Sequence, residues 1–221
     1  MKYNICVPYR NRESQLKVFL EKFPEYFKNQ PYGSDFNLII VEQDNSKQFN
    51  LGCLINVGYD LFKNGILDYK YDLNDCYIFH PVDNTPINVD YSLPDGIGYT
   101  LYSTPHQCAH TEYYFKGVGW RNSTYESMNG YSNKYWGYSA EDDDMMFRLS
   151  YLNLPAKRVP CIFESMEKDD VPDNTNKDHM RSLYYQVRMT GDRSSGFSDL
   201  KYEVKDKNIL GSNIMHVKVD I

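Results

Sequence analysis

The sequence lacks the long apolar run of roughly 20 residues that a membrane-spanning helix needs. It also lacks a signal-peptide-like apolar block among its first residues. Basic residues are outnumbered by acidic ones, giving a net charge of −6, whereas a nucleic-acid groove needs a basic surface. We therefore expect a soluble, cytoplasmic protein with no membrane segment and no nucleic-acid partner.

Several familiar site motifs are also missing. The five cysteines form no CxxC pair and no other zinc spacing, and most lie in or beside apolar stretches. This predicts reduced, buried thiols in a reducing compartment. Neither GxGxxG nor GxxxxGK[ST] occurs, which excludes a Rossmann fingerprint and a P-loop.

The composition is that of a folded chain. Hydrophobic residues make up 41% and charged residues 24% of the 221 residues, close to the average of globular proteins, and the length suits one domain. The 21 tyrosines offer flat apolar faces with hydroxyls, which suit sugars and bases. Codon bias can produce the same enrichment, so the tyrosines alone assign no ligand.

Strand and helix patterns alternate through the first 85 residues. Expected strands cover 5–7, 36–41 and 76–79, and expected helices cover 11–29 and 51–62. Pro8 should end the first strand, and Pro24 should kink or end the first helix near Phe23. This order predicts an α/β fold with a mainly parallel central sheet flanked by helices.

The rest of the chain gives fewer signals. Residues 88–107 read as a loop, and a helix is expected over 122–128 with a cap at 129–130. Residues 169–179 are polar, and we expect them to be mobile. The tail, 214–221, alternates like a half-buried strand.

Ligands of a parallel sheet bind beyond the carboxyl ends of its strands. The loops at 9–12 and 80–85 are therefore candidate ligand loops. Arg10 and Arg12 carry forked guanidinium groups that suit a diphosphate. Asp83 is a hard oxygen ligand for Mn²⁺ or Mg²⁺ if other oxygen ligands converge on it.

An acidic run, Glu141 to Asp144, precedes an apolar helical stripe, so it lies at a helix start. It is either a solvated helix end or part of a site. Residues three apart share a helix face, so Asp142 projects apart from Glu141 and Asp144. In a partly enclosed site such a carboxylate can accept a proton from an attacking hydroxyl.

Six segments carry a family resemblance in the right order along the chain: VPYRNRE at 7–13, FN at 49–50 with LINVGY at 54–59, YIFHPVDNTP at 77–86, NGYSNKYWGY at 129–138 followed by EDDD at 141–144, LYYQV at 183–187 and VKVDI at 217–221. They resemble VPFRNRE, FN…LLNVGF, FxFxDVDLIP, NGFPNxYWGWGGEDDD, LxYQV and ITVDI of the beta-1,4-galactosyltransferase family. The resemblance implies a GT-A type fold in a single compact domain, with a nucleotide-sugar-binding half at 1–87 and an acceptor-binding half at 88–221. It further implies Mn²⁺-assisted (or Mg²⁺-assisted), inverting transfer of a galactose-like hexose from a UDP-sugar donor to a glycan acceptor.

The resemblance also assigns residues by position. Those that would hold uridine and diphosphate are Pro8, Tyr9, Arg10 and Arg12. Further donor-side residues would be Phe49, Val82, Asp83, Tyr114, Trp136 and Tyr138. Glu141, Asp142 and Asp143 would hold sugar hydroxyls, with Asp142 as the general base.

The chain departs from the family at three places. Pro81 replaces the first acid of the DVD triplet, so Asp83 would be the one metal ligand there. The family's methionine and histidine ligands fall near Cys161 and Glu164, with Glu167 as a second choice. The WGG of the family's mobile loop is Tyr138-Ser139-Ala140, which removes glycine freedom.

Two other functions stay open from the sequence. The fold can serve a carbohydrate- or nucleotide-binding protein that lost turnover through Pro81 and the altered metal ligands, or a transferase that works without a metal. The stretch before LYYQV is shorter than in the family, so an N-acetylglucosamine acceptor does not follow. Four histidines are expected to be surface or structural residues: His80, His106, His110 and His179.

Overall fold

The computed structural model describes residues 1–33, 35–92, 98–103, 117–137, 139–154, 157–166 and 176–221. The strands are β1 (Tyr3–Tyr9), β2 (Phe36–Gln43), β3 (Cys76–Phe79), β4 (Asn84–Asn88), β5 (Gly98–Ser103), β6 (Gly117–Arg121), β7 (Lys157–Ser165), β8 (Glu203–Gly211) and β9 (Ile214–Asp220). The helices are α1 (Glu13–Lys28), α2 (Leu51–Lys63), α3 (Asn122–Ser127), α4 (Glu141–Tyr151) and α5 (Lys177–Thr190), with short 3₁₀ turns at Ile66–Asp68 and Phe197–Asp199.

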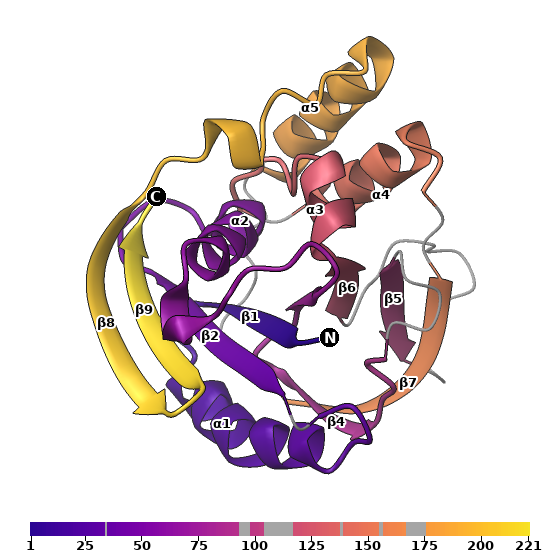
Figure 1. Ribbon diagram of the computed structural model, residues 1–221. Helices are drawn as coiled ribbons and strands as arrows, with labels where there is room; N and C mark the ends of the chain where they lie inside the picture. The colour runs from indigo at the N-terminus through magenta and orange to yellow at the C-terminus, as the bar shows by residue number, and fades with distance from the viewer. Residues whose placement is uncertain (34, 93–97, 104–116, 138, 155–156, 167–175) are drawn as a thin grey trace.

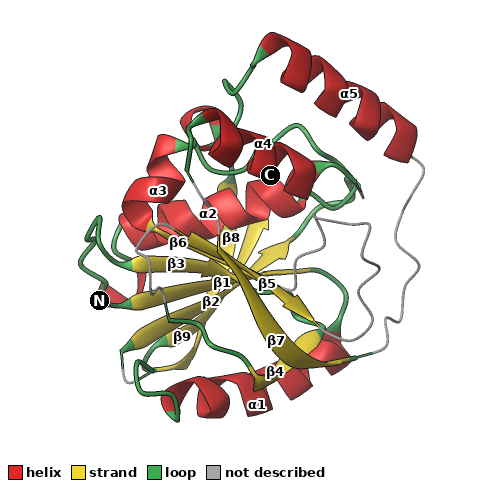
Figure 2. Ribbon diagram, turned by 90° about the vertical axis from the view of Figure 1, so that its right-hand side faces the viewer, coloured by secondary structure: helices red, strands yellow, loops and turns green. Residues whose placement is uncertain are grey.

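One sheet of nine strands runs through the described chain, in the order β4-β7-β5-β6-β3-β1-β2-β9-β8. Its centre, β3-β1-β2-β9, is parallel throughout, as the alternating pattern predicts. Toward both edges most pairs are antiparallel. Helix α1 covers one face of the sheet and α2, α3 and α4 cover the other (Figures 1 and 2).

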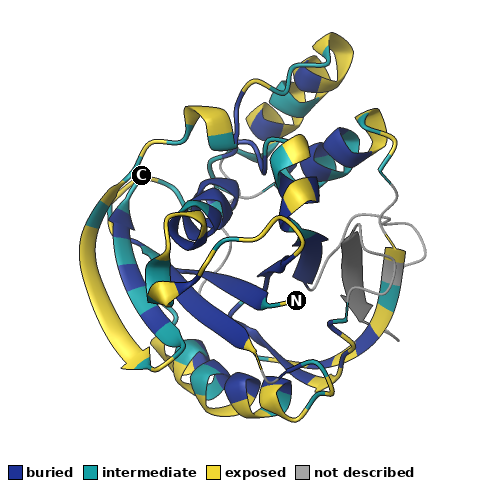
Figure 3. Cartoon of the chain, in the orientation of Figure 1, coloured by how far each residue is buried: buried dark blue, intermediate teal, exposed yellow. Residues whose placement is uncertain are grey.

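Alternation along the central strands divides the core in two, because successive strand residues face opposite sides. Ile5 and Val7 pack on the α1 side, with Phe19, Phe23 and other residues. Cys6 packs on the α2 side, in a cluster that extends to α3 and α4. The central strands are buried on both faces (Figure 3).

Pro24 does not end the first helix near Phe23, because α1 runs from Glu13 to Lys28 with Pro24 inside it. Phe19, Phe23 and Phe27 are fully buried and stack along the helix, with ring centroids 4.6 and 5.7 Å apart. This aromatic burial offsets the one helical hydrogen bond that proline cannot donate.

The loops expected at 80–85 and 88–107 are partly wrong. Strand β4 begins within the first of them, and β5 lies within the second. Pro8 also does not end the first strand; it pairs with Val41 inside β1. Strands β6, β7 and β8 were not predicted either. Most of β8 is exposed and joins the sheet through β9 alone, so its sequence carries no two-faced apolar pattern.

Other expectations can be compared directly. Cys6, Cys53, Cys76 and Cys161 are free, buried thiols as predicted, and Cys108 lies outside the described residues. The tail strand β9 alternates as expected. No helix in the described part of the chain combines the length and apolar character needed to cross a bilayer.

Candidate active site

The first and third strands end side by side, and their loops meet there. The Arg12 guanidinium lies 3.3 Å from the Asp83 carboxylate, Nη1 to Oδ2. Asp83 is 6% exposed, and its Oδ1 accepts a hydrogen bond from the Asn84 amide at 2.9 Å. The structure therefore brings together the carboxylate and one of the two arginines that the sequence singles out.

His80 shapes the turn that presents Asp83. It is buried, its Nδ1 lies 2.9 Å from the Pro81 carbonyl oxygen, and its Nε2 lies 2.8 Å from the Tyr91 hydroxyl. Burial lowers the pKa of His80 to about 4, so the ring is neutral near pH 7, with Nδ1 donating and Nε2 accepting. This is the structural role expected of it.

Arg10 and Phe49, which the sequence predicts to lie on the donor side, are in contact. The guanidinium carbon of Arg10 lies 5.4 Å from the centroid of the Phe49 ring, and its Nη1 donates to the Lys47 carbonyl at 2.6 Å. A guanidinium stacked on an aromatic face is held in a fixed orientation. Pro8 lies in β1, next to Tyr9, and Arg10 directly follows the strand.

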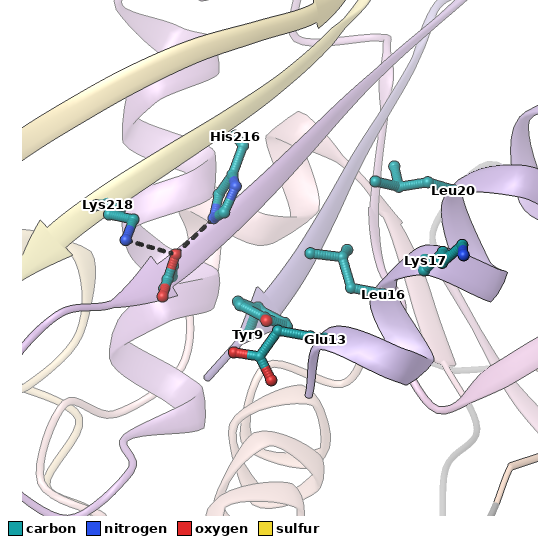
Figure 4. A pocket seen from close by; sticks show the side chains of 8 residues that line it. Tyr9, Glu13, Leu16, Lys17, Leu20, His216 and Lys218 are labelled. Atoms are coloured by element: carbon teal, nitrogen blue, oxygen red, sulfur yellow. Dashed lines mark ion pairs between the residues drawn. The ribbon is translucent and has the colours of Figure 1, made fainter. Parts of the chain in front are cut away.

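Tyr9 and Val82 lie on the α1 side of the sheet, in the core cluster around α1. The Tyr9 ring meets His216 edge-on, with centroids 5.8 Å apart. Tyr9 and His216 line a pocket of about 480 Å³ beside α1 (Figure 4). In this pocket the Glu42 carboxylate pairs with His216 at 2.7 Å and with Lys218 at 3.6 Å. The structure does not bring the Tyr9 ring to Phe49.

The two other predicted metal ligands have different surroundings on β7. Cys161 is buried in the α1-side core, whereas Glu164 is exposed and pairs with Lys22 of α1 at 2.6 Å. Binding of one ion by both side chains stays a prediction. The residue of this strand end that lies beside Asp83 is Met166, whose N–H donates to the Asp83 carbonyl at 2.8 Å.

The fit of a metal ion rests on the donor atoms at hand. Asp83 supplies one hard carboxylate oxygen, the ligand type that Mn²⁺ and Mg²⁺ prefer. Within the described ranges, no three His, Cys, Asp or Glu residues form a cluster that could hold an ion. Glu167 lies outside them. Asp83 thus fits as a ligand that needs the phosphates of a bound nucleotide, and Glu164 as a second ligand stays a prediction.

The acidic helix α4 follows a segment with an unusual backbone. Gly137, Ser139 and Ala140 have φ values of 93°, 135° and 76°, in the left-handed region. Only glycine adopts such angles without strain. The Ser139 N–H then donates to Glu141 Oε2 at 3.1 Å, so this tight turn fixes where the helix and its carboxylates begin.

Asp142 is the carboxylate with the most perturbed surroundings. Burial, and then the neighbouring Glu141 and Asp143, hold the pKa of Asp142 well above its ordinary value, while a contact from the Tyr131 hydroxyl acts in the other direction. That hydroxyl lies 3.5 Å from Asp142 Oδ1. Burial also raises the pKa of Glu141. A carboxylate with raised basicity in a site is a candidate general base.

Asp144 and Arg148 form a buried ion pair that the sequence analysis missed. Both side chains are almost fully buried, and Arg148 Nε donates to Asp144 Oδ2 at 2.6 Å. The guanidinium also donates to the carbonyls of Met128, Gly130 and Ser195. The acid–arginine spacing of four residues on one helix was the available signal. The pair ties the first turns of α4 to the loop before it.

The loop before α2, residues 47–50, and the segment before α4 are in contact. The Gly137 N–H donates to the Phe49 carbonyl at 2.8 Å, and the Lys47 ammonium lies 5.5 Å from the centroid of the Trp136 ring. These contacts hold the segments that carry Phe49 and Trp136 against each other, and both residues are predicted to lie on the donor side. Tyr114 and Tyr138 lie outside the described residues.

The chain is similar to known proteins over most of its length. Residues 1–93 match the family model for the N-terminal region of glycosyl transferase group 7, and residues 104–169 match the model described as the N-terminal domain of galactosyltransferase. The chain is 30% identical to beta-1,4-galactosyltransferase 4 of Cricetulus griseus over 226 residues, covering 95% of this chain and 61% of that protein. It is 27% identical to the xylosylprotein 4-beta-galactosyltransferase of Caenorhabditis elegans, covering 93% of this chain and 72% of that protein.

Solved structures show the same fold. The catalytic domain of Drosophila beta-1,4-galactosyltransferase 7, in complex with xylobiose, matches with a TM-score of 0.75 at 21% identity, covering 100% of this chain and 94% of that one. A mutant of that enzyme in complex with manganese, UDP-Gal and xylobiose matches with a TM-score of 0.73, at the same identity and coverage. These likenesses confirm the GT-A type fold. The chain spans about three fifths of the length of the Cricetulus relative.

Proposed function

Because the chain belongs to the beta-1,4-galactosyltransferase family, we propose that it is an inverting glycosyltransferase. It moves a galactose-like hexose from a UDP-sugar to a hydroxyl of a glycan acceptor. One observation carries this proposal: the Asp142 carboxylate, with its raised pKa, begins a helix whose preceding turn contacts the donor-side residue Phe49. A base and a nucleotide-binding surface are thus adjoining parts of one site.

The donor would lie over the carboxyl ends of β1 and β3. Phe49 with the stacked Arg10 offers a flat surface for the uracil ring, and Arg12 offers a forked donor to the diphosphate. Trp136, beside Lys47, would flank the sugar end. The relative crystallised with UDP-Gal supports this class of donor.

A divalent ion, Mn²⁺ or Mg²⁺, would be held at Asp83, next to Arg12. When bound, it would neutralise the negative charge on the departing diphosphate. Arg12 contributes to the same neutralisation from the protein itself, because it already lies 3.3 Å from the Asp83 carboxylate. The manganese in the related structure supports the use of a divalent ion.

The transfer is a single in-line displacement. The acceptor hydroxyl oxygen forms a bond to the anomeric carbon of the sugar while the bond from that carbon to the UDP oxygen breaks, so the configuration inverts. Asp142 takes the hydroxyl proton, for which its raised pKa suits it. Glu141 and Asp143 would hold sugar hydroxyls and align the two reactants.

A screen of UDP-sugars by mass spectrometry, with xyloside and N-acetylglucosaminide acceptors, tests the proposal. We expect transfer that Mn²⁺ stimulates, and we expect Asp142→Asn to lower kcat at least about 100-fold while UDP still binds. Loss of UDP binding together with activity would contradict the role of Asp142 as base. If no UDP-sugar gives transfer, the proposed glycosyltransferase activity is contradicted.

A binding protein without turnover is the second candidate. Pro81 in place of an acid favours it, because it leaves Asp83 as the one carboxylate of that turn. Calorimetric titration of UDP with and without Mn²⁺ separates the candidates. Affinity for UDP that rises with the metal supports the transferase, and glycan binding without UDP affinity supports the binding protein.

A further inference from the structure

The Tyr131 side chain reaches the proposed base from the core of the protein. Its ring is fully buried on the α2 side of the sheet, and its hydroxyl donates toward Asp142 Oδ1 at 3.5 Å. The distance is longer than the roughly 2.5–3.0 Å that is usual for such a bond. Catalytic hydrogen bonds are often long without substrate and shorten in the reacting complex.

The backbone of Tyr131 is held on both sides by one buried amide. Asn56 of α2 accepts from the Tyr131 N–H at 3.1 Å and donates to the Tyr131 carbonyl at 2.8 Å. The same Asn56 oxygen accepts from the Tyr125 hydroxyl, which fixes the amide in turn. The backbone of Tyr131 is therefore held by α2, while Arg148 of the acidic helix holds the neighbouring Gly130 carbonyl.

The ring of Tyr131 is also fixed. It meets Trp120 of β6 edge-on, with centroids 5.9 Å apart at an angle of 77°. A ring held by its backbone and by an aromatic neighbour leaves its hydroxyl with little freedom, since packed side chains keep one rotamer. The donor is in place before any substrate arrives, which is the condition for electrostatic preorganisation.

We propose that Tyr131 is a positioning residue of the transfer reaction, whose hydroxyl orients the Asp142 carboxylate and favours its ionised form. The inference rests on the proposed function. The family motif has phenylalanine at this place in NGF, where this chain has NGY at 129–131. The family motif therefore does not include this hydroxyl, which is particular to this chain.

The groups around Asp142 mostly oppose its ionisation, so a hydrogen-bond donor to its carboxylate has a clear effect. On its own helix, the carboxylates of Glu141 and Asp143 oppose its ionisation, whereas the contact from Tyr131 favours it. From α5, Arg181 acts on Asp143, and the backbone donor at Ser139 serves Glu141. Removing the Tyr131 hydroxyl therefore raises the pKa of Asp142, and the base is protonated at a higher pH.

Tyr131→Phe tests this with the smallest change available. We expect kcat near pH 7 to fall roughly three- to tenfold, the size of one modest hydrogen bond. The acidic limb of the pH profile of kcat should also move to higher pH. Tyr77→Phe is the matched control, because Tyr77 is equally buried and its hydroxyl donates to the Ile55 carbonyl within the same core cluster. Its profile should coincide with that of the unmodified protein.

A titration that does not depend on turnover completes the test. The carboxyl carbons of ¹³C-labelled aspartates are followed by NMR, with the Asp142 signal assigned from its loss in Asp142→Asn. A higher midpoint for Asp142 in Tyr131→Phe, and an unchanged one in Tyr77→Phe, supports the role. Transfer by the unmodified protein with superimposable profiles for Tyr131→Phe overturns this inference alone. No transfer by the unmodified protein overturns the proposed function and this inference with it.

Discussion

The Phe49 carbonyl accepts a hydrogen bond from the Gly137 N–H at 2.8 Å. This bond joins the loop that enters α2 to the turn that leads into the acidic helix α4. Gly137 has a φ of 93°, so glycine suits the conformation that aims its N–H at Phe49. The side predicted to bind the nucleotide and the side predicted to carry the base are therefore fixed to each other through backbone atoms.

Asp142 should make the protein less stable as the pH rises. Its pKa is higher in the folded chain than in the unfolded one, so between the two values the folded state binds more protons. Stability then falls as the pH rises through that interval. Asp142→Asn removes this loss, and its gain in the urea midpoint should be larger at pH 8 than at pH 4.5. Asp178→Asn, at an exposed position of α5, is the control and should give no such trend. A gain that shrinks with pH would contradict the burial argument.

Asp83→Ala should abolish the effect of Mn²⁺ on UDP affinity, because it removes the one carboxylate at the end of β3. Cys161→Ala should retain the effect, since that thiol lies in the core on the α1 side. Calorimetric titration of UDP into each variant, with and without the metal, measures both. A full metal response in Asp83→Ala would exclude Asp83 as a ligand.

Arg148→Met should destabilise the protein by about 3–5 kcal/mol, because the Asp144 carboxylate is left buried without its partner. Burial already raises the pKa of Asp144 with the arginine in place. Changing Asp144 to leucine in the same chain should recover part of the loss, and the carbonyls that Arg148 serves account for the rest. Lys22→Met breaks the exposed pair with Glu164 and should change stability by less than about 1 kcal/mol. Equal losses in Arg148→Met and Lys22→Met, measured by urea unfolding, would refute this view of the buried pair.

Ala140→Gly should not weaken the protein, although glycine usually destabilises a helical region. Ala140 has φ 76° and ψ −8°, and an L-residue pays roughly 1–2 kcal/mol for a left-handed conformation. Loss of that strain offsets the greater freedom of glycine in the unfolded chain. Ser150→Gly, at an exposed place in the same helix, should instead cost about 0.5–1 kcal/mol. Thermal unfolding of the two variants compares them, and a larger loss for Ala140→Gly would show that the turn is unstrained.

The central strands could be predicted from the sequence because they are buried on both faces, which gives an apolar run such as residues 38–41 of β2. The flanking strands could not be, since β8 is mostly exposed and β4 contains a proline. Such strands form because a partner strand from elsewhere in the chain supplies their hydrogen bonds. No local pattern records that partner.

The chemistry available at each position follows from the amino-acid sequence alone: the acidic run at a helix start, arginines after the first strand and Asp83 after the third. Which of these side chains come into contact depends on the tertiary structure. The Arg12 guanidinium lies against the Asp83 carboxylate. The Tyr9 ring contacts His216 and not Phe49, and the Tyr131 hydroxyl lies beside Asp142. The reason is physical: side-chain type and period are local properties, whereas a contact between distant residues depends on strand register and on how the layers pack.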